Sequence, residues 1–299
     1  MKKSLASFAK WVASLLPRGA PEFIYTILLK PGPLRKLANA VLFSIIPSQL
    51  SISEGIVMLN TNDPVVSGAL TLGVYEKLET ELLRDLLRPG MTVIDIGANV
   101  GYYTLIACSH VGDAGRVIAF EPDPENFSFL EQTVSANSFT NVSLECLGIS
   151  DQTGAAELFL SSDNKGDHRI YRFSPRQEAV TISLVTLDSY IKAHAVQSID
   201  LIKMDIQGAE GKALQGMQET LKAQKTLTLI TEFWPQGLKI AGSDPLWFLG
   251  LLRELGFSIS EIREDTGQLQ IVSDFSHLIG SLPGRKYTNL LCIKEQVKD

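Results

Sequence analysis

MTVIDIGANVGYYTL, residues 91–105, joins an apolar strand-like run to a glycine loop and then to a helical pattern. The loop reads D-x-G-x-x-x-G from Asp95 through Gly97 to Gly101, so a carboxylate stands two residues before the first glycine. A dinucleotide would place its pyrophosphate against such a loop and helix N-terminus, where Asp95 would repel it. The pattern also differs from the G-x-G-x-x-G of dinucleotide-binding folds. The loop therefore favours a ligand that carries a cation and no phosphate.

The chain after residue 91 alternates strand-like and helix-like segments. Five short apolar runs, most of them bounded by turn residues, are MTVIDI, GRVIAFE, NVSLEC, IDLIKMD and TLTLITE. Helical patterns such as PENFSFLEQTVSAN and AEGKALQGMQETL separate them. This alternation is typical of βαβ units, so we predict a doubly wound α/β fold with a mostly parallel sheet and helices on both faces. We also expect an inserted β-hairpin from AAELFL to TISLVTL, and two final strands at FSISEI and YTNLLCIK.

The start of the chain is basic, whereas the rest is acidic. Residues 1–40 carry seven Lys and Arg against one Glu, which leaves 20 basic and 32 acidic residues in the other 259. The apolar positions that recur at helical spacing near the N-terminus are Leu5, Phe8, Val12 and Leu15. We therefore predict a basic amphipathic helical element over residues 1–50, which either caps the main domain or lies on a membrane surface.

Two further regions follow this element. Residues 51–90 are predicted to hold a β-hairpin, at ISEGIVMLN, and an amphipathic helix that leads into the main domain over residues 91–299. No apolar run approaches the roughly 20 residues that a membrane-spanning helix needs. Three widely spaced cysteines favour a reducing compartment, so we expect a cytoplasmic protein, with peripheral membrane contact if residues 1–50 provide it. The acidic body argues against a nucleic-acid partner.

Ligands of an open parallel sheet bind beyond the carboxyl ends of its strands. Acids stand at the ends of four of the five predicted strands: Asp95, Glu121, Asp205 and Glu232. S-adenosylmethionine has a sulfonium and an ammonium that attract carboxylates, and its own carboxylate can bind helix amides. Glu121, twenty residues beyond Gly101, is placed for the two ribose hydroxyls. The residues that we expect to bind this cofactor are Asp95, Gly97, Ala98, Asn99, Gly101, Glu121, Pro122, Leu147 and Asp205.

The chain resembles the FkbM-type S-adenosylmethionine-dependent methyltransferases. The matching stretches, which span roughly residues 70 to 235, are LGVYE, VIDIGANVGYYT, GRVIAFEPDPENF, VTLDSYI, IDLIKMDIQGAE and ITEFWP. Gln207 departs from the family's more usual D-V-E-G-A-E, which removes an acid at that position. The resemblance implies a class I methyltransferase fold with a seven-stranded sheet. It also implies methylation of a hydroxyl on a small-molecule or glycan acceptor, commonly a sugar or a natural product.

Methylation of a hydroxyl requires a group that removes its proton, and that group must lie within hydrogen-bond reach. The candidates, in our order of preference, are Asp205, Glu232, His168 and Glu210. Asp205 comes first because the sheet fixes the end of its strand, whereas Glu210 equally suits a helix N-terminus. A divalent ion held by Asp205 and Glu232 is an alternative, since hard cations take oxygen ligands. Phe233 and Trp234 either stack on a sugar or pack in the core.

The long polar loop SSDNKGDHRIYRFSPRQEA inside the inserted hairpin is basic in an otherwise acidic domain. Its basic residues are Lys165, His168, Arg169, Arg172 and Arg176. The loop either folds over the cleft and recognises an acidic or phosphorylated acceptor, or lies in solvent. Besides a methyltransferase, two function classes stay open: a nicotinamide-dependent oxidoreductase, which Asp95 disfavours, and a non-catalytic module that only binds the cofactor.

Overall fold

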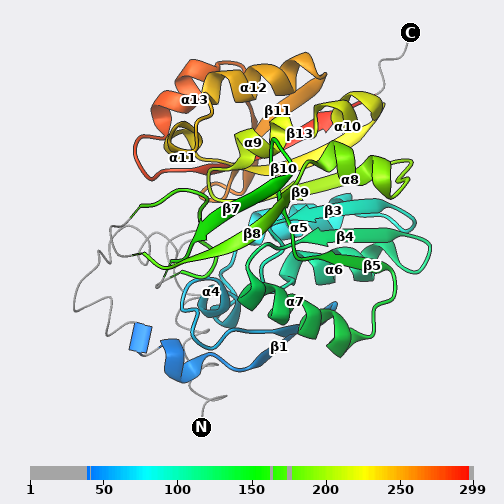
Figure 1. Cartoon of the computed structure of the whole chain (residues 1–299), viewed down its shortest axis with the longest axis vertical. Helices are drawn as coiled ribbons and strands as arrows, with labels where there is room; N and C mark the ends of the chain where they lie inside the picture. Colours follow the sequence, from blue (N-terminus) through cyan, green and yellow to red (C-terminus); the bar gives the residue numbers. More distant parts are fainter. Residues whose placement is uncertain (1–38, 41, 162–163, 174–176, 296–299) are drawn as a thin grey trace.

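An eight-stranded sheet organises the protein, and helices lie on both of its faces (Figure 1). The structure, a computed structural model, describes residues 39–40, 42–161, 164–173 and 177–295. Most of the element predicted over residues 1–50 lies outside the described residues. Across the sheet the strands follow the order β12 (Gln268–Ile271), β11 (Phe257–Arg263), β13 (Thr288–Lys294), β10 (Leu227–Phe233), β9 (Leu201–Met204), β3 (Thr92–Ile96), β4 (Arg116–Phe120) and β5 (Val142–Glu145).

The five strands from β10 to β5 run parallel, as the sequence predicts. β13 is antiparallel to both β10 and β11, so the two predicted C-terminal strands join the same sheet. The first strand of the parallel set, β3, lies between β4 and β9, and Asp95 is in register with Ala119 on one side and Lys203 on the other. The residues that follow β3, β4, β9 and β10 therefore meet at one edge of the sheet.

Consecutive residues of the parallel strands enter two different cores, because side chains alternate across a strand. Ile94 and Ile202 pack under one group of helices, whereas their neighbours Val93 and Leu201 pack under the other. The first face is covered by α8 (Leu187–Ala193), α9 (Glu210–Gln215), α10 (Gln218–Ala223), α12 (Pro245–Glu254) and α13 (Phe275–Ser281). The second face is covered by α5 (Lys77–Leu86) and α6 (Tyr102–Val111).

Three more helices and two small sheets add to the described fold. α7 (Pro124–Asn137) follows β4 over the run that the sequence predicts to be helical, α4 (Val66–Leu72) precedes α5, and α11 (Pro235–Ile240) follows β10. The predicted N-terminal hairpin is present as β1 (Gln49–Ile52) and β2 (Gly55–Met58). The inserted hairpin is present as β7 (Gly154–Phe159) and β8 (Ala179–Val185), and a short β6 (Gly148–Ile149) adds to it.

Two details differ from the sequence-based expectation. The seven expected strands are present, but β12 pairs with β11 and adds an eighth at the edge of the sheet. All four residues of β12 are exposed, so no buried face marks it in the sequence. The single helix expected over AEGKALQGMQETL is divided into α9 and α10. The chain bends at Gly216, where a Cβ would collide with the carbonyl oxygen of Ser150.

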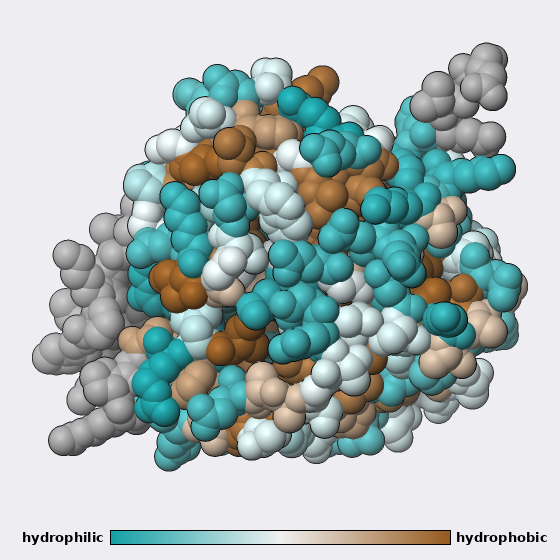
Figure 2. Space-filling model, turned by 45° about the horizontal axis from the view of Figure 1, so that its top comes forward, coloured by the Kyte–Doolittle hydropathy of each residue, from teal (hydrophilic) through white to brown (hydrophobic). Residues whose placement is uncertain are grey.

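The described residues contain no helix that is both long enough and apolar enough to span a membrane. On the face seen in Figure 2, apolar side chains gather in several separate patches with polar side chains between them.

Candidate active site

A large cavity of about 1500 Å³ opens where the ends of the parallel strands meet. Eight of the residues predicted to bind or react line it: Gly97, Asn99, Glu121, Pro122, Leu147, His168, Asp205 and Glu232. The other four, Asp95, Ala98, Gly101 and Glu210, are buried behind its wall. The prediction that the strand ends carry the site therefore agrees with where the cavity lies.

The glycine loop after β3 has the backbone that its sequence predicts. Gly97 has a φ of +86°, and a Cβ there would collide with the carbonyl oxygen of Asp205. Gly101 has a φ of +87°, and a Cβ there would lie 2.8 Å from Leu130 Cδ1 on α7. Gly97 thus allows close approach to the neighbouring strand end and Gly101 allows close packing of helices. No side chain among the described residues caps α6, so its first amides can bind a ligand carboxylate.

Asp95 does not face the cavity. Its side chain is buried at the end of β3, and its Oδ2 accepts a hydrogen bond of 2.6 Å from Thr104 Oγ1 on α6. Burial raises the pKa of Asp95, although the hydrogen bond from Thr104 and the charge of Lys203 act in the opposite direction. In this structure Asp95 fixes α6 against β3, and it can act on a ligand through its charge rather than by direct contact.

Glu121 faces the cavity from the end of β4, where the ribose was expected. Its Oε2 accepts a hydrogen bond of 2.8 Å from the amide of Asn99, and its Oε1 accepts one of 2.9 Å from the amide of Asp123. Burial raises the pKa of Glu121 to about 8, despite these two bonds. The carboxylate is therefore held in place by the glycine loop and by the start of α7, with lone pairs left for ligand hydroxyls.

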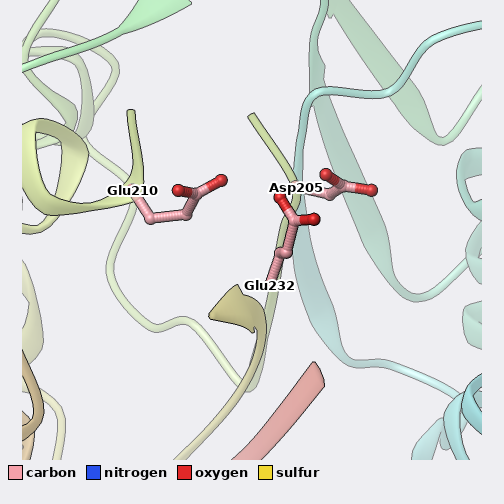
Figure 3. A group of neighbouring side chains, drawn as sticks. All are labelled: Asp205, Glu210 and Glu232. Carbon is pink, nitrogen blue, oxygen red and sulfur yellow. The ribbon is translucent and has the colours of Figure 1, made fainter. Parts of the chain in front are cut away.

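Asp205, Glu210 and Glu232 form a second group of acids at the ends of β9 and β10. Each contributes one carboxylate oxygen to a set in which all lie within 4.8 Å of one another. In Figure 3 the Glu210 carboxylate points toward that of Glu232, and the Asp205 carboxylate lies on the other side of Glu232 and points away from Glu210. Three of the four candidate bases predicted from the sequence are therefore neighbours at the ends of β9 and β10, and His168 is not in this group.

The three acids differ in their partners. Glu210 accepts hydrogen bonds of 2.9 Å from the amides of Ile206 and Gly208, one on each oxygen. Asp205 accepts one of 2.7 Å from Gln207 Nε2, and its Oδ2 lies 3.8 Å from Lys203 Nζ. Glu232 Oε2 is buried and has no hydrogen-bond partner among the described residues. Glu210 therefore stabilises the start of α9, whereas Glu232 Oε2 can accept a hydrogen bond from a ligand.

Burial also determines how these acids titrate. It raises the pKa of Glu210 to about 7, against the backbone hydrogen bonds that lower it. It raises the pKa of Glu232 well above its usual range, and the charges of Asp205 and Glu210 add to that effect. Carboxyl groups that are close together and buried cannot all ionise, so a proton or a cation is held among them. Oxygen ligands of this kind also suit a hard divalent cation.

The polar loop predicted to act as a lid does lie over the cavity in its described part, residues 164–173. Asn99 and Asn126 donate to the carbonyl oxygen of Lys165, at 3.4 and 3.0 Å. On the other side of the cavity, the Arg169 guanidinium lies 4.6 Å from the ring centroid of Trp234. The described part of the loop thus contacts both the glycine-loop side and the β10 side of the cavity, which agrees with the alternative that the loop folds over the cleft. Arg176 lies outside the described residues.

Two basic residues of this lid are already paired with acids. Lys165 Nζ lies 2.8 Å from Glu125, and Arg169 Nε lies 2.6 Å from Asp167. His168 accepts a hydrogen bond of 3.0 Å from the Ser161 amide on Nδ1, and its Nε2 lies 3.5 Å from Asp123. His168 therefore lies against the start of α7. Recognition of an acidic acceptor by this loop stays a prediction.

The aromatic pair after β10 belongs to the core. Phe233 is fully buried and stacks on Phe248, with 5.9 Å between the ring centroids. Trp234 is 5% exposed, lies under Arg169, and donates a 2.8 Å hydrogen bond to the carbonyl oxygen of Gly284. The hypothesis that these rings stack on a sugar is therefore wrong for Phe233, and in this conformation Trp234 is covered.

Two residues at this edge were missed by sequence reasoning. Lys203, on β9, is buried among acids, and its Nζ lies 3.1 Å from Glu79 Oε1. Glu76, from LGVYE, lines the cavity, although it precedes the glycine loop by about 20 residues. A lysine inside an otherwise apolar strand was the available signal for the first, and the LGVYE match was the signal for the second.

The fold and the site together define a class I methyltransferase. The parallel strands in the order β5-β4-β3-β9-β10, the antiparallel β13, the glycine loop after β3 and the acid after β4 are the features of that class. More narrowly, the chain belongs to the FkbM methyltransferase family, because the profile described as Methyltransferase FkbM domain matches residues 95–259. The prediction of the family is confirmed.

Three curated relatives are similar to this chain over part of its length. The 2-O-methyltransferase NoeI of Sinorhizobium fredii is 26% identical over 178 residues, which cover 54% of this chain and 71% of NoeI. The hexuronic acid methyltransferase AglP of Haloferax volcanii is 28% identical over 174 residues, or 57% of this chain and 66% of AglP. The AMB antimetabolite synthetase AmbE of Pseudomonas aeruginosa is 28% identical over 221 residues, which are 60% of this chain but only 10% of AmbE.

S-adenosylmethionine is the cofactor of this class, and the residues present fit it. The glycine loop lets a ligand approach the backbone closely, and the uncapped start of α6 offers amides to the cofactor's carboxylate. The Asn99 amide holds the Glu121 carboxylate where it can accept hydrogen bonds from the ribose hydroxyls. The cavity is also large enough for a second molecule, because 1500 Å³ exceeds the upper end of the roughly 300–1,000 Å³ typical of ligand pockets.

Proposed function

We propose that this methyltransferase transfers a methyl group from S-adenosylmethionine to a hydroxyl, that of a sugar in a glycan, a glycolipid or a natural product. The observation that carries the proposal is the group of acids at the ends of β9 and β10, with Glu232 Oε2 buried and without a partner. Two of the relatives, NoeI and AglP, are named for methylation of an oxygen position or of a sugar acid, which supports a saccharide acceptor.

The chemistry favours a neutral acceptor at this position. S-adenosylmethionine, when bound, supplies a methyl carbon that is activated by positive sulfur. A hydroxyl that attacks it must lose a proton, whereas a carboxylate acceptor needs no base. Asp205 and Glu232, which line the cavity with Glu210 behind them, disfavour a carboxylate and offer a hydroxyl a group that accepts its proton. The acids therefore support formation of an ether rather than an ester.

Glu232 is the base that this geometry favours. Its Oε2 has no partner among the described residues, and burial raises its pKa, so the ionised carboxylate is a stronger base than an exposed one. Asp205, our first choice from the sequence, is engaged by Gln207 and lies near Lys203. Glu210 has both oxygens on backbone amides and does not line the cavity. We therefore assign proton removal to Glu232 and acceptor orientation to Asp205.

The test is a methyl-transfer assay with labelled cofactor and a panel of saccharides, some neutral and some containing uronic acids. An ether product keeps its label in alkali, whereas a methyl ester releases it. Alkali-stable label on a saccharide supports the proposal. Alkali-labile label would assign the reaction to a carboxylate instead, and cofactor binding without any transfer across the panel would favour the non-catalytic module.

A further inference from the structure

Glu76 is an acid that faces the cavity from outside the residues that the family profile matches. It precedes α5 and has φ 33° and ψ 58°, a left-handed conformation that costs free energy for any residue other than glycine. Five described non-glycine residues have a positive φ, and three of them line the cavity: Glu76, Asn99 and Gln207. Backbone strain of this kind is concentrated at functional sites, so the position of Glu76 calls for a ligand-based reason.

Tyr103 holds the Glu76 carboxylate beside the glycine loop. The Tyr103 hydroxyl donates a hydrogen bond of 2.7 Å to Glu76 Oε2. Tyr103 is the second residue of α6, two positions after Gly101, so the carboxylate is held close to the start of α6. That helix start is where the carboxylate of the cofactor's amino-acid end is expected. The ammonium of the same amino acid is attached to the adjacent carbon, and it must therefore lie nearby.

The charges around Glu76 are unbalanced in favour of acids. Lys203 Nζ lies 3.1 Å from Glu79 and 3.8 Å from Asp205, and 4.7 Å from the ring centroid of Tyr103. Burial raises the pKa of Glu76 well above its usual range, the charge of Glu79 raises it further, and Lys203 only partly offsets this. Lys203 thus stands among three acids, Glu76, Glu79 and Asp205. This excess of acids favours the binding of a cation, and a bound cation would favour the ionised form of Glu76.

We propose that the Glu76 carboxylate binds the ammonium group of S-adenosylmethionine, with Tyr103 as its positioning residue. The inference rests on the proposed function, because it takes S-adenosylmethionine as the ligand. It makes the segment ahead of the methyltransferase core a part of the cofactor site. A cofactor without its ammonium should then lose most of the benefit that Glu76 provides.

The experiment compares two ligands by titration calorimetry: S-adenosylhomocysteine and its analogue that lacks the α-amino group. Neither carries the sulfonium, so only the ammonium differs. The parent should bind the amino ligand about 10- to 100-fold more tightly, as expected for a charge-assisted hydrogen bond. Glu76→Gln should lose this preference while it binds the analogue as the parent does. Tyr103→Phe should reduce the preference by a smaller factor, and Glu157→Gln, an exposed acid of β7, should leave it unchanged.

The outcomes separate this inference from the proposed function. If the parent binds neither ligand, the proposed function fails and the role of Glu76 fails with it. If the parent binds both but Glu76→Gln weakens both equally, the residue acts on the fold and the inference is overturned. If Glu76→Gln does not fold by circular dichroism, Tyr103→Phe and Glu76→Asp decide, because either one should still shrink the ratio between the two ligands. An unchanged ratio in both would overturn the inference.

Discussion

Cofactor affinity should rise with pH up to about 8, because Glu121 is mostly protonated in the free protein at neutral pH. Burial raises its pKa to about 8, so roughly 1% of the group is ionised at pH 6, roughly 10% at pH 7 and half at pH 8. Ribose hydroxyls that donate to this carboxylate favour its ionised form. Binding must therefore remove a proton below pH 8, which costs about 1.4 kcal/mol for each pH unit.

The expected size of the effect follows from those fractions. Affinity should increase about tenfold from pH 6 to pH 7, about fivefold from pH 7 to pH 8, and by less than about twofold above that. Titration calorimetry with S-adenosylhomocysteine between pH 6 and 9 measures the change. Repeating it in two buffers with different ionisation enthalpies measures the proton released on binding. The part of that release that Glu121 provides, which is the difference between the parent and Glu121→Gln, should approach one proton at pH 6 and vanish near pH 9.

Glu121→Gln is the matched control for this prediction. The ligand's own amino group also titrates near pH 8 in a model α-amine, and it loses its charge as the pH rises, so its effect has the opposite sign. The variant retains that effect, together with any proton that Glu76 releases when the ammonium binds, but should lose the part of the rise in affinity and of the proton release that Glu121 provides. An affinity that is flat between pH 6 and 8 in the parent would refute the reasoning. So would a Glu121→Gln variant that keeps the parent's slope.

Three more results are expected. Glu232→Gln should lower kcat and kcat/KM together by about 10²- to 10⁴-fold and spare cofactor affinity in calorimetry, and near-parental turnover would move the base to Asp205. The melting temperature of the unliganded protein should fall as the pH rises from about 4.5 to about 8. Glu210 and Glu121 have folded pKa values of about 7 and about 8, above the unfolded value of 4.5, so their stabilisation is complete below pH 4.5, declines between the unfolded and folded values and is gone above pH 8. A melting temperature that rises in this window in scanning calorimetry would contradict the prediction. If Asp205, Glu210 and Glu232 hold a divalent ion, a chelator should abolish turnover and added Mg²⁺ or Mn²⁺ should restore it, whereas chelator-resistant turnover would leave the acids as bases only.

The sequence by itself determined the sheet and the edge at which the site lies. Apolar runs of strand length alternate with helical patterns, and this local information is enough to specify βαβ units. Once the strands are parallel, the residues that follow β3, β4, β9 and β10 must meet at one edge, whatever the details of packing. Glu121, Asp205 and Glu232 were therefore predictable as neighbours of the cavity, and the structure places all three on it.

Only the tertiary structure decided which acids face the ligand and which support the fold. Asp95 and Glu121 both lie at the ends of parallel strands. Asp95 is buried and accepts a hydrogen bond from Thr104 on α6, whereas Glu121 lines the cavity. Glu76 reaches the same cavity from ahead of the domain because Tyr103 holds it there. These outcomes depend on contacts between segments far apart in the chain, and burial and partners, rather than residue type, set the pKa of each carboxyl.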